Sequence, residues 1–327
     1  MLTFFAPGKA GIEATPDAMT MPSGVNWIDA VRPDPQEIAF LERTLGLEVP
    51  TLKALSEIET SSRLHSEKDW LYLSIPMVYR KDGFMPELTP LGFVLSKDML
   101  LTVRFKDMKA FDDVPETISQ RPAQAGGPAA LIAVLEAIVD HAADVLKGIG
   151  GDLDCLSEEI FGTNAAKPRR HRPREDGEQL RHVLRKVGRN GDFLSKIEDL
   201  LLGMARMVPY VAANAAPNLA VDVRAKLESL QRDIASLNDY ETHLTDKIQF
   251  LLDATLGLTN IDQNNIFRIL TVVSVVGIPP TFFASMWGMN FKNIHEYDWA
   301  YGYQYGLFVI ALSALVPIIW FKWRGWW

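Results

Sequence analysis

Cysteine is almost absent from this chain, which excludes two kinds of structure. Among 327 residues there is a single cysteine, Cys155. One thiol cannot form an intrachain disulfide, and it cannot supply the ligands of a cysteine-based zinc cluster. The six histidines are scattered and are better explained as surface or packing residues than as metal ligands. We therefore expect neither a disulfide framework nor a cysteine-based metal centre.

A basic surplus is also missing, since 33 lysines and arginines stand against 41 acidic residues and give a net charge of -8. This balance argues against nucleic-acid binding, because phosphate contacts need a basic surface. It suits either cation handling or ordinary solubility, and both interpretations stay open. No nucleotide-binding loop, nucleophile triad or HExxH pair is present. The chain is therefore not expected to be an enzyme.

Long apolar runs are lacking until the end of the sequence. The N-terminus has no basic region followed by an apolar stretch, so it does not predict a signal peptide, and we expect the body of the protein to stay in the cytosol. Two apolar runs then follow, Ile266–Trp287 and Tyr301–Phe321. Each has roughly 20 residues, enough to cross about 30 Å of hydrocarbon as a helix. Only a short polar loop separates them, which predicts a membrane hairpin.

Charged residues beside the two runs predict their orientation. Arg268 lies at the start of the first run, and Lys322 and Arg324 follow the second. The loop between the runs carries Glu296 and Asp298. Since positive residues favour the cytoplasmic side, both termini should be cytoplasmic and the loop periplasmic.

The sequence before the hairpin predicts a mixed α and β part followed by long helices. Strands are expected at Lys68–Arg80 and, as a pair turning at Lys97-Asp98, within Phe93–Phe105. A helix is expected over Asp34–Leu47, with Asp34 as its N-cap. The stretch Gln120–Pro128 is rich in proline and glycine and marks a boundary.

Helical periodicity dominates from Ala129 onward. The Gly150-Gly151 pair should weaken the first of these helices, and Pro209 should end the second, which covers Glu178–Val208. The third begins near Val221 and meets no proline until Pro279. A helix of about 65 residues would be roughly 100 Å long, so we infer an oligomer in which such stalk helices pack side by side. Its seam is predicted at Leu227, Leu230, Ile234, Leu237, Tyr240, Leu244, Ile248, Leu251, Leu252 and Thr255.

These patterns predict an α+β cytosolic domain, long stalk helices and a C-terminal transmembrane hairpin. The predicted boundaries are 1–125 for the α/β domain, 126–265 for the helical domain and 266–327 for the transmembrane domain. Within the last, the spans are 266–287 and 301–321, and the periplasmic loop is 288–299.

A polar stripe on the first span suggests an ion path. Two spans cannot enclose a path alone, so symmetry must supply its wall. The second span is nearly all apolar and should face lipid. The small hydroxyl residues of the first could instead serve helix packing, and that alternative stays open. The stripe comprises Asn264, Thr271, Ser274, Thr281 and Ser285, with Phe267 and Ile278 completing the three-four spacing.

Neither span contains Asp, Glu, His or Cys. Direct binding of a dehydrated divalent ion would favour carboxylates, and zinc or cobalt would favour imidazole or thiolate ligands. Amide and hydroxyl oxygens suit an ion that keeps its water, and Mg²⁺ loses water reluctantly. The stripe therefore fits hydrated Mg²⁺ better than a transition metal.

The segment WGMNF, Trp287–Phe291, resembles the aromatic-Gly-Met-Asn signature of CorA-type magnesium channels. The resemblance covers the order of elements in the whole chain, but it is motif-level only after about residue 250. Further positions match the family pattern at Leu251-Leu252-Asp253, Asn264, Pro279-x-Thr281, Glu296, Trp299, Gly302-Tyr303 and Lys322.

The resemblance implies a funnel-shaped homopentamer in the cell inner membrane, with a filter for hydrated Mg²⁺ made by Gly288, Met289 and a ring of Asn290 amides. It implies a polar ring at Thr281 and an inner mouth near Asn264. Its apolar constrictions would be Ile278, Leu270 and Phe267, so it selects Leu270 where the stripe selects Thr271.

The family also senses cytosolic Mg²⁺ through carboxylates between subunits. Here Ser229 occupies the expected acidic position, which leaves Asp82, Glu228 and Asp233 as candidates. The outer loop departs from the family pattern as well, at Ile294-His295.

Transport without a nucleotide motif must be driven by the ion gradient and the membrane potential, which gives a divalent ion roughly 4–5 kcal/mol per 100 mV. The leading expectation is a Mg²⁺-importing channel, with Co²⁺ or Ni²⁺ as further cargo. The alternatives are a zinc or cobalt transporter of the ZntB-like branch and a membrane-anchored enzyme or scaffold.

Overall fold

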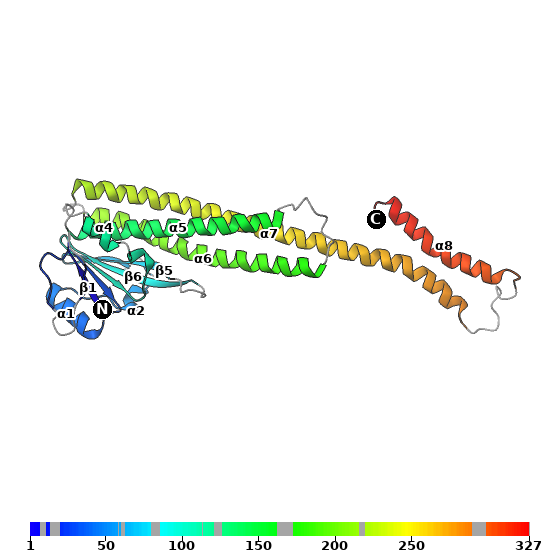
Figure 1. The fold of residues 1–327 in the computed structure, drawn as a ribbon, viewed down its shortest axis with the longest axis horizontal. Helices are drawn as coiled ribbons and strands as arrows, with labels where there is room; N and C mark the ends of the chain where they lie inside the picture. Colours follow the sequence, from blue (N-terminus) through cyan, green and yellow to red (C-terminus); the bar gives the residue numbers. More distant parts are fainter. Residues whose placement is uncertain are drawn as a thin grey trace. The chain divides into compact units, whose positions relative to one another are not determined.

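The fold is drawn in Figure 1 from a computed structural model. Its chain forms two compact units, Met1–Leu252 and Asp253–Trp327, and helix α7 (Val221–Trp287) begins in the first and ends in the second. The predicted boundaries at 125 and 265 stay a prediction. The structure describes residues 1–6, 11–13, 20–57, 59, 63–79, 86–112, 114–120, 126–161, 173–215, 220–289 and 299–326.

The first unit contains one sheet with the strand order β2-β1-β3-β7-β6-β5-β4. Neighbouring strands are antiparallel except β3 and β7, which are parallel. The predicted strand pair is confirmed as β6 and β7, and the Ser96 amide donates to the Met99 carbonyl at 2.8 Å across the turn. The strands are β1 (Leu2–Phe5), β2 (Ile12–Glu13), β3 (Trp27–Val31), β4 (Leu64–Glu67), β5 (Trp70–Tyr79), β6 (Glu87–Leu95) and β7 (Leu100–Arg104).

Side chains on alternate residues of the sheet enter two different cores. Leu73 and Ile75 of β5 pack with long helices on one face, whereas Tyr72 packs on the other face with Phe40 and Leu41. The second face is covered by α1 (Pro35–Leu45) and α2 (Leu52–Leu55). The sheet is therefore the middle layer of three.

Helix α1 confirms the prediction made from its ends. The Asp34 side chain accepts from the amides of Gln36 and Glu37, and the Glu37 side chain accepts from the Asp34 amide in return. Pro35 occupies the first helical position, and Gly46 adopts a left-handed conformation (φ 67°) at the C-cap. Local capping chemistry fixes both ends of this helix.

Long helices cover the other face of the sheet and extend beyond it (Figure 1). They follow a short segment made of η1 (Lys109–Phe111) and α4 (Val114–Gln120). The helices α5, α6 and α7 share an apolar core of their own, and Lys247 of α7 forms an ion pair with Asp154 of α5. Their bounds are Gly127–Phe161 for α5, Pro173–Asn214 for α6 and Val221–Trp287 for α7.

One sequence-based prediction about these helices was wrong, the end of α6 at Pro209, and the local weakening of α5 at Gly150-Gly151 stays a prediction. Helix α5 continues through Gly150-Gly151, and a Cβ at Gly150 would lie 2.6 Å from the Tyr240 hydroxyl oxygen of α7. Gly150 therefore permits a close approach between helices. Helix α6 continues past Pro209 to Asn214, because Val208 and Val211 on either side are fully buried in the core. Such packing offsets the roughly 3 kcal/mol that a helical proline costs.

Most positions of the predicted α7 seam are buried or half-buried, but the prediction included Tyr240 and missed Val223 and Glu241. Tyr240 is 39% exposed, whereas Glu241 is only 5% exposed. When Glu241 replaces Tyr240 in the seam, successive seam residues are alternately four and three positions apart, which is the repeat of a coiled-coil helix. The seam residues are Val223, Leu227, Leu230, Ile234, Leu237, Glu241, Leu244, Ile248 and Leu251.

The second unit holds the end of α7 and the helix α8 (Gly302–Trp323). Both are long and apolar enough to cross a membrane by length and composition. Only 6% of the most apolar window of each is buried, so neither resembles the core helix of a soluble domain. The two predicted apolar helices are therefore confirmed, with Pro279 and Pro280 inside the first.

Candidate functional site

The helix α8 runs back along α7 and contacts it at both ends. Near the connecting loop, the rings of Trp287 and Tyr305 meet edge to face at 6.3 Å. A Cβ on Gly306 would lie 3.6 Å from the Trp287 ring, so the glycine lets the indole approach the α8 backbone. At the far end, an Arg268 nitrogen donates to the Gly325 carbonyl at 2.6 Å. These contacts define which face of α7 is covered.

The covered face of α7 lies opposite the stripe that the sequence singles out. Val272 is buried, and the residues half-buried with it are Arg268, Ser274, Val276, Pro279, Pro280, Phe283 and Trp287. Val276 follows Phe267 by nine residues, which is about 180° around a helix. Of the predicted lining residues, only Ser274 is half-buried. The others, Asn264, Phe267, Leu270, Ile278 and Thr281, are exposed.

Two hydroxyl groups of the stripe donate to the backbone of their own helix. Thr271 Oγ1 donates to the Phe267 carbonyl and Thr281 Oγ1 to the Gly277 carbonyl, each at 2.8 Å. Because each hydroxyl proton is used in a backbone hydrogen bond, the Thr271 and Thr281 oxygens can act toward other groups only as acceptors, through their lone pairs. Acceptors of this kind can bind the water shell of a cation.

The segment predicted to form the filter begins where α7 ends. The Gly288 amide donates to the Ala284 carbonyl at 3.0 Å and so continues the last turn. A Cβ at Gly288 would lie 3.2 Å from that same oxygen, and Met289 is 49% exposed. The predicted filter residue Asn290 and the loop residue Glu296 lie outside the described residues.

The candidate regulatory carboxylates are only partly described. Glu228 and Asp233 are exposed on α7, and Asp82 lies outside the described residues. Burial raises the pKa of Asp140 on α5, and the charges of Glu136, Asp144 and Asp233 raise it further. The described part of the chain brings no three His, Cys, Asp or Glu side chains close enough to hold a metal ion.

The sequence analysis missed Glu241, a buried carboxyl group inside the helical core. Thr245 Oγ1 donates to Glu241 Oε1 at 2.9 Å. Burial raises the pKa of Glu241, and the negative charge of Glu198 on α6 adds to that effect. A strict four-three count from Leu237 to Leu244 would have found this residue.

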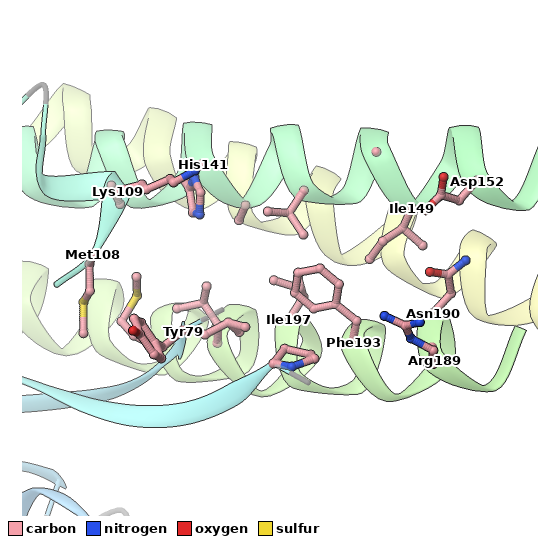
Figure 2. Close-up of a pocket in the computed structure, with 18 of the residues that line it drawn as sticks. Tyr79, Met108, Lys109, His141, Ile149, Asp152, Arg189, Asn190, Phe193 and Ile197 are labelled. Atoms are coloured by element: carbon pink, nitrogen blue, oxygen red, sulfur yellow. The ribbon is translucent and has the colours of Figure 1, made fainter. Parts of the chain in front are cut away.

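A cavity of about 650 Å³ lies in the first unit between α5, α6, η1 and the end of β5 (Figure 2). Lys109 and His141 lie at one end, and Asp152, Arg189 and Asn190 lie at the other. The wall between them is apolar. Burial lowers the pKa of His141 and so favours the neutral ring. None of the predicted site residues that the structure describes lines this cavity.

The chain is similar to known proteins over most of its length. The family model described as CorA-like Mg²⁺ transporter protein matches residues 22–323. The magnesium transport protein CorA of Pasteurella multocida is 29% identical over 302 residues, which is 92% of this chain and 91% of that protein.

Solved structures show the same fold. The CorA magnesium transporter of Methanocaldococcus jannaschii has a TM-score of 0.79 at 19% identity and covers 100% of this chain and 99% of that one. The cytoplasmic domain of ZntB from Vibrio parahaemolyticus is more distant, with a TM-score of 0.50 at 12% identity over 79% of this chain and 97% of that one. Since the family model spans nearly the whole sequence, this chain belongs to the CorA-like Mg²⁺ transporter family.

Proposed function

We propose that the chain forms a gradient-driven channel that imports hydrated Mg²⁺ across the cell inner membrane. The observation that carries the proposal is the exposed stripe of α7. Apart from the half-buried Ser274, its hydroxyl and amide groups lie on the face that α8 leaves uncovered, in or beside the apolar end of α7. Polar groups at membrane depth are retained where they line a polar path or a helix interface.

In this proposal the ion meets amide oxygens at both mouths. Asn290 forms the outer filter with Gly288 and Met289, and Asn264 lies near the inner mouth. Rings of amide and hydroxyl oxygens can hold an ion through its water shell without removing it. Phe267, Leu270, Ser274, Ile278 and Thr281 line the path between them.

The proposed wall requires several copies of the chain. One α7 helix offers a stripe and cannot enclose a path, so its exposed face must meet the same face of other copies. The number five and the funnel shape come from family resemblance. The charges beside the spans support cytoplasmic termini, with Glu296 in the outer loop.

Cytosolic Mg²⁺ is proposed to close the channel by bridging carboxylates of neighbouring subunits. Glu228 and Asp233 are exposed on the described part of α7 and are available to a second copy. Asp82 is the third candidate. Without an ion these carboxylates repel each other, and a divalent ion removes that repulsion.

Co²⁺ and Ni²⁺ are proposed as further cargo, and zinc transport is the alternative function. The structural likeness to the ZntB domain is confined to the soluble part and does not bear on the stripe. The described spans contain no imidazole, thiolate or carboxylate that would favour a transition metal.

Metal-specific uptake into proteoliposomes tests the proposal. Wild-type protein should take up Mg²⁺, and Asn290→Ala should abolish uptake while the oligomer stays intact. Asn293→Ala, which removes another amide from the same loop, is the matched control and should retain uptake. Normal uptake by an assembled Asn290→Ala protein would show that the filter lies elsewhere, and uptake of Zn²⁺ alone would favour the alternative.

A further inference from the structure

The C-terminal end of α8 is a built turn. Gly325 adopts a left-handed conformation (φ 69°), its amide donates to the Lys322 carbonyl at 3.2 Å, and the Trp326 amide donates to the Phe321 carbonyl at 3.0 Å. This pair of hydrogen bonds around a left-handed glycine is a Schellman cap. It turns Trp326 back onto Phe321, with the two rings 5.4 Å apart.

Arg268 of α7 holds this turn by two contacts. Its Nη2 donates to the Gly325 carbonyl at 2.6 Å, and its guanidinium carbon lies 5.4 Å from the centre of the Trp326 ring. Its Nε is buried and has no partner within the described chain. Phe321 beneath the turn is only 3% exposed. We call Arg268, Phe321, Gly325 and Trp326 the tail latch.

The tail latch is the contact between α7 and α8 at the end of the hairpin away from Gly288. Arg268 follows Phe267 directly and precedes Leu270 by two residues. Successive residues lie about 100° apart around a helix, so fixing Arg268 toward α8 fixes the direction of its neighbours. Phe267 and Leu270 are 64% and 60% exposed, on the side that α8 does not cover.

We propose that Arg268 is a positioning residue, which uses the tail latch to set the rotation of α7 so that Phe267 and Leu270 face the ion path. This inference rests on the proposed function. The role needs arginine rather than any cation. A planar guanidinium can stack on an indole and donate in its own plane to a carbonyl at the same time, whereas a lysine ammonium is a compact point charge.

Cysteine accessibility can measure the rotation of α7. Cys155 is the only cysteine, so Cys155→Ser gives a cysteine-free parent. Phe267→Cys and Ile269→Cys then place single thiols about 200° apart around the helix. A water-soluble methanethiosulfonate reagent is applied to each full-length variant in proteoliposomes. The Phe267→Cys thiol should react roughly tenfold faster, because only that side of the helix meets water.

The tail latch is then altered in this background. Arg268→Ala, Arg268→Lys and Trp326→Ala should each bring the ratio of the two rates to within about threefold, as α7 loses its fixed rotation. Arg324→Ala is the matched control and should leave the ratio unchanged. The Arg324 guanidinium also stacks on a tryptophan, with its central carbon 5.5 Å from the centre of the Trp320 ring, but this contact lies within the end of α8 and does not link α8 to α7.

Arg268→Lys is the deciding variant, because it keeps the charge and is the least disruptive. All variants are compared only where gel filtration gives the elution volume of the parent. A parent-like ratio in Arg268→Lys and Trp326→Ala would overturn the tail latch and leave the proposed channel intact. Equal rates at Phe267→Cys and Ile269→Cys in the parent itself would overturn both the lining face and the latch's role in setting it.

Discussion

Two neighbouring glycines of α5, Gly150 and Gly151, differ in whether another helix lies close to them. A Cβ at Gly150 would meet the Tyr240 hydroxyl, whereas a Cβ at the neighbouring Gly151 would meet nothing within 4 Å. From sequence the two glycines look equivalent, since both lower helix propensity. Only the partner helix distinguishes them, and a single sequence does not reveal which glycine faces that helix.

We expect Gly151→Ala to stabilise the protein by about 0.5–1 kcal/mol, because alanine is the better helix former. Gly150→Ala should give less, because its Cβ must displace the Tyr240 hydroxyl. Thermal unfolding of the full chain measures both. In a Tyr240→Phe background the two substitutions should become equal, and a persistent difference there would contradict the assigned contact.

At the scale of elements, local signals predicted much of the fold. The cap residues of α1 and the apolar alternation of β5 act within a few residues, so the sequence contains what is needed to find them. The extension of α6 past Pro209 depends on burial of Val208 and Val211 against residues far away in the sequence. Such tertiary packing is not visible in a local window.

Glu241 gives the helical core a pH dependence with a definite sign. Its pKa is raised in the folded protein, so the folded state keeps its proton to a higher pH than the unfolded state does. Stability from this group is therefore complete below its ordinary pKa of 4.5 and is lost as pH rises through the folded value. Glu241→Gln should be more stable than wild type at pH 7, with a difference that shrinks on acidification.

Unfolding midpoints measured from about pH 4 to pH 8 would show this convergence. Asp239→Asn changes an exposed acid two residues away and should leave the profile unaltered. Parallel profiles for wild type and Glu241→Gln would mean that Glu241 has the same pKa in both states.

At the scale of the whole molecule, the proposed ion path needs more than one copy of the chain. Family membership and two apolar helices were predictable from the motif and from run length. The three-four spacing predicted which face of α7 lines the path. The position of α8, which covers the opposite side of α7, supports the same face. The assembly that we propose would place the same face of another copy against it, and a single chain cannot show that contact.

Native mass spectrometry in detergent should give five subunits. The physical basis is the exposed apolar and hydroxyl-bearing side of α7, which includes Ile278 at 65% exposure and needs a partner surface. The value five rests on family resemblance. A monomer or dimer under conditions that preserve Mg²⁺ uptake would contradict the assembly.

Millimolar Mg²⁺ should protect the long helices from limited proteolysis. Bridging of carboxylates between copies would favour the closed arrangement, and the shift is limited by how much more tightly that state binds the ion. A triple variant with alanine at Asp82, Glu228 and Asp233 should lose the protection. Equal protection of both proteins would assign sensing to other residues.

The four-three spacing of the α7 seam also determines the handedness with which α7 winds around its neighbouring helices. Buried or half-buried residues recur every seven positions from Val223 to Leu251, but a straight α-helix drifts by about 20° per seven residues. Over four repeats the drift would reach about 80°, enough to turn one end of the seam to solvent. The seam stays buried only if α7 winds around α5 and α6 in a left-handed sense. Moving the same apolar residues to an eleven-residue repeat would reverse that hand.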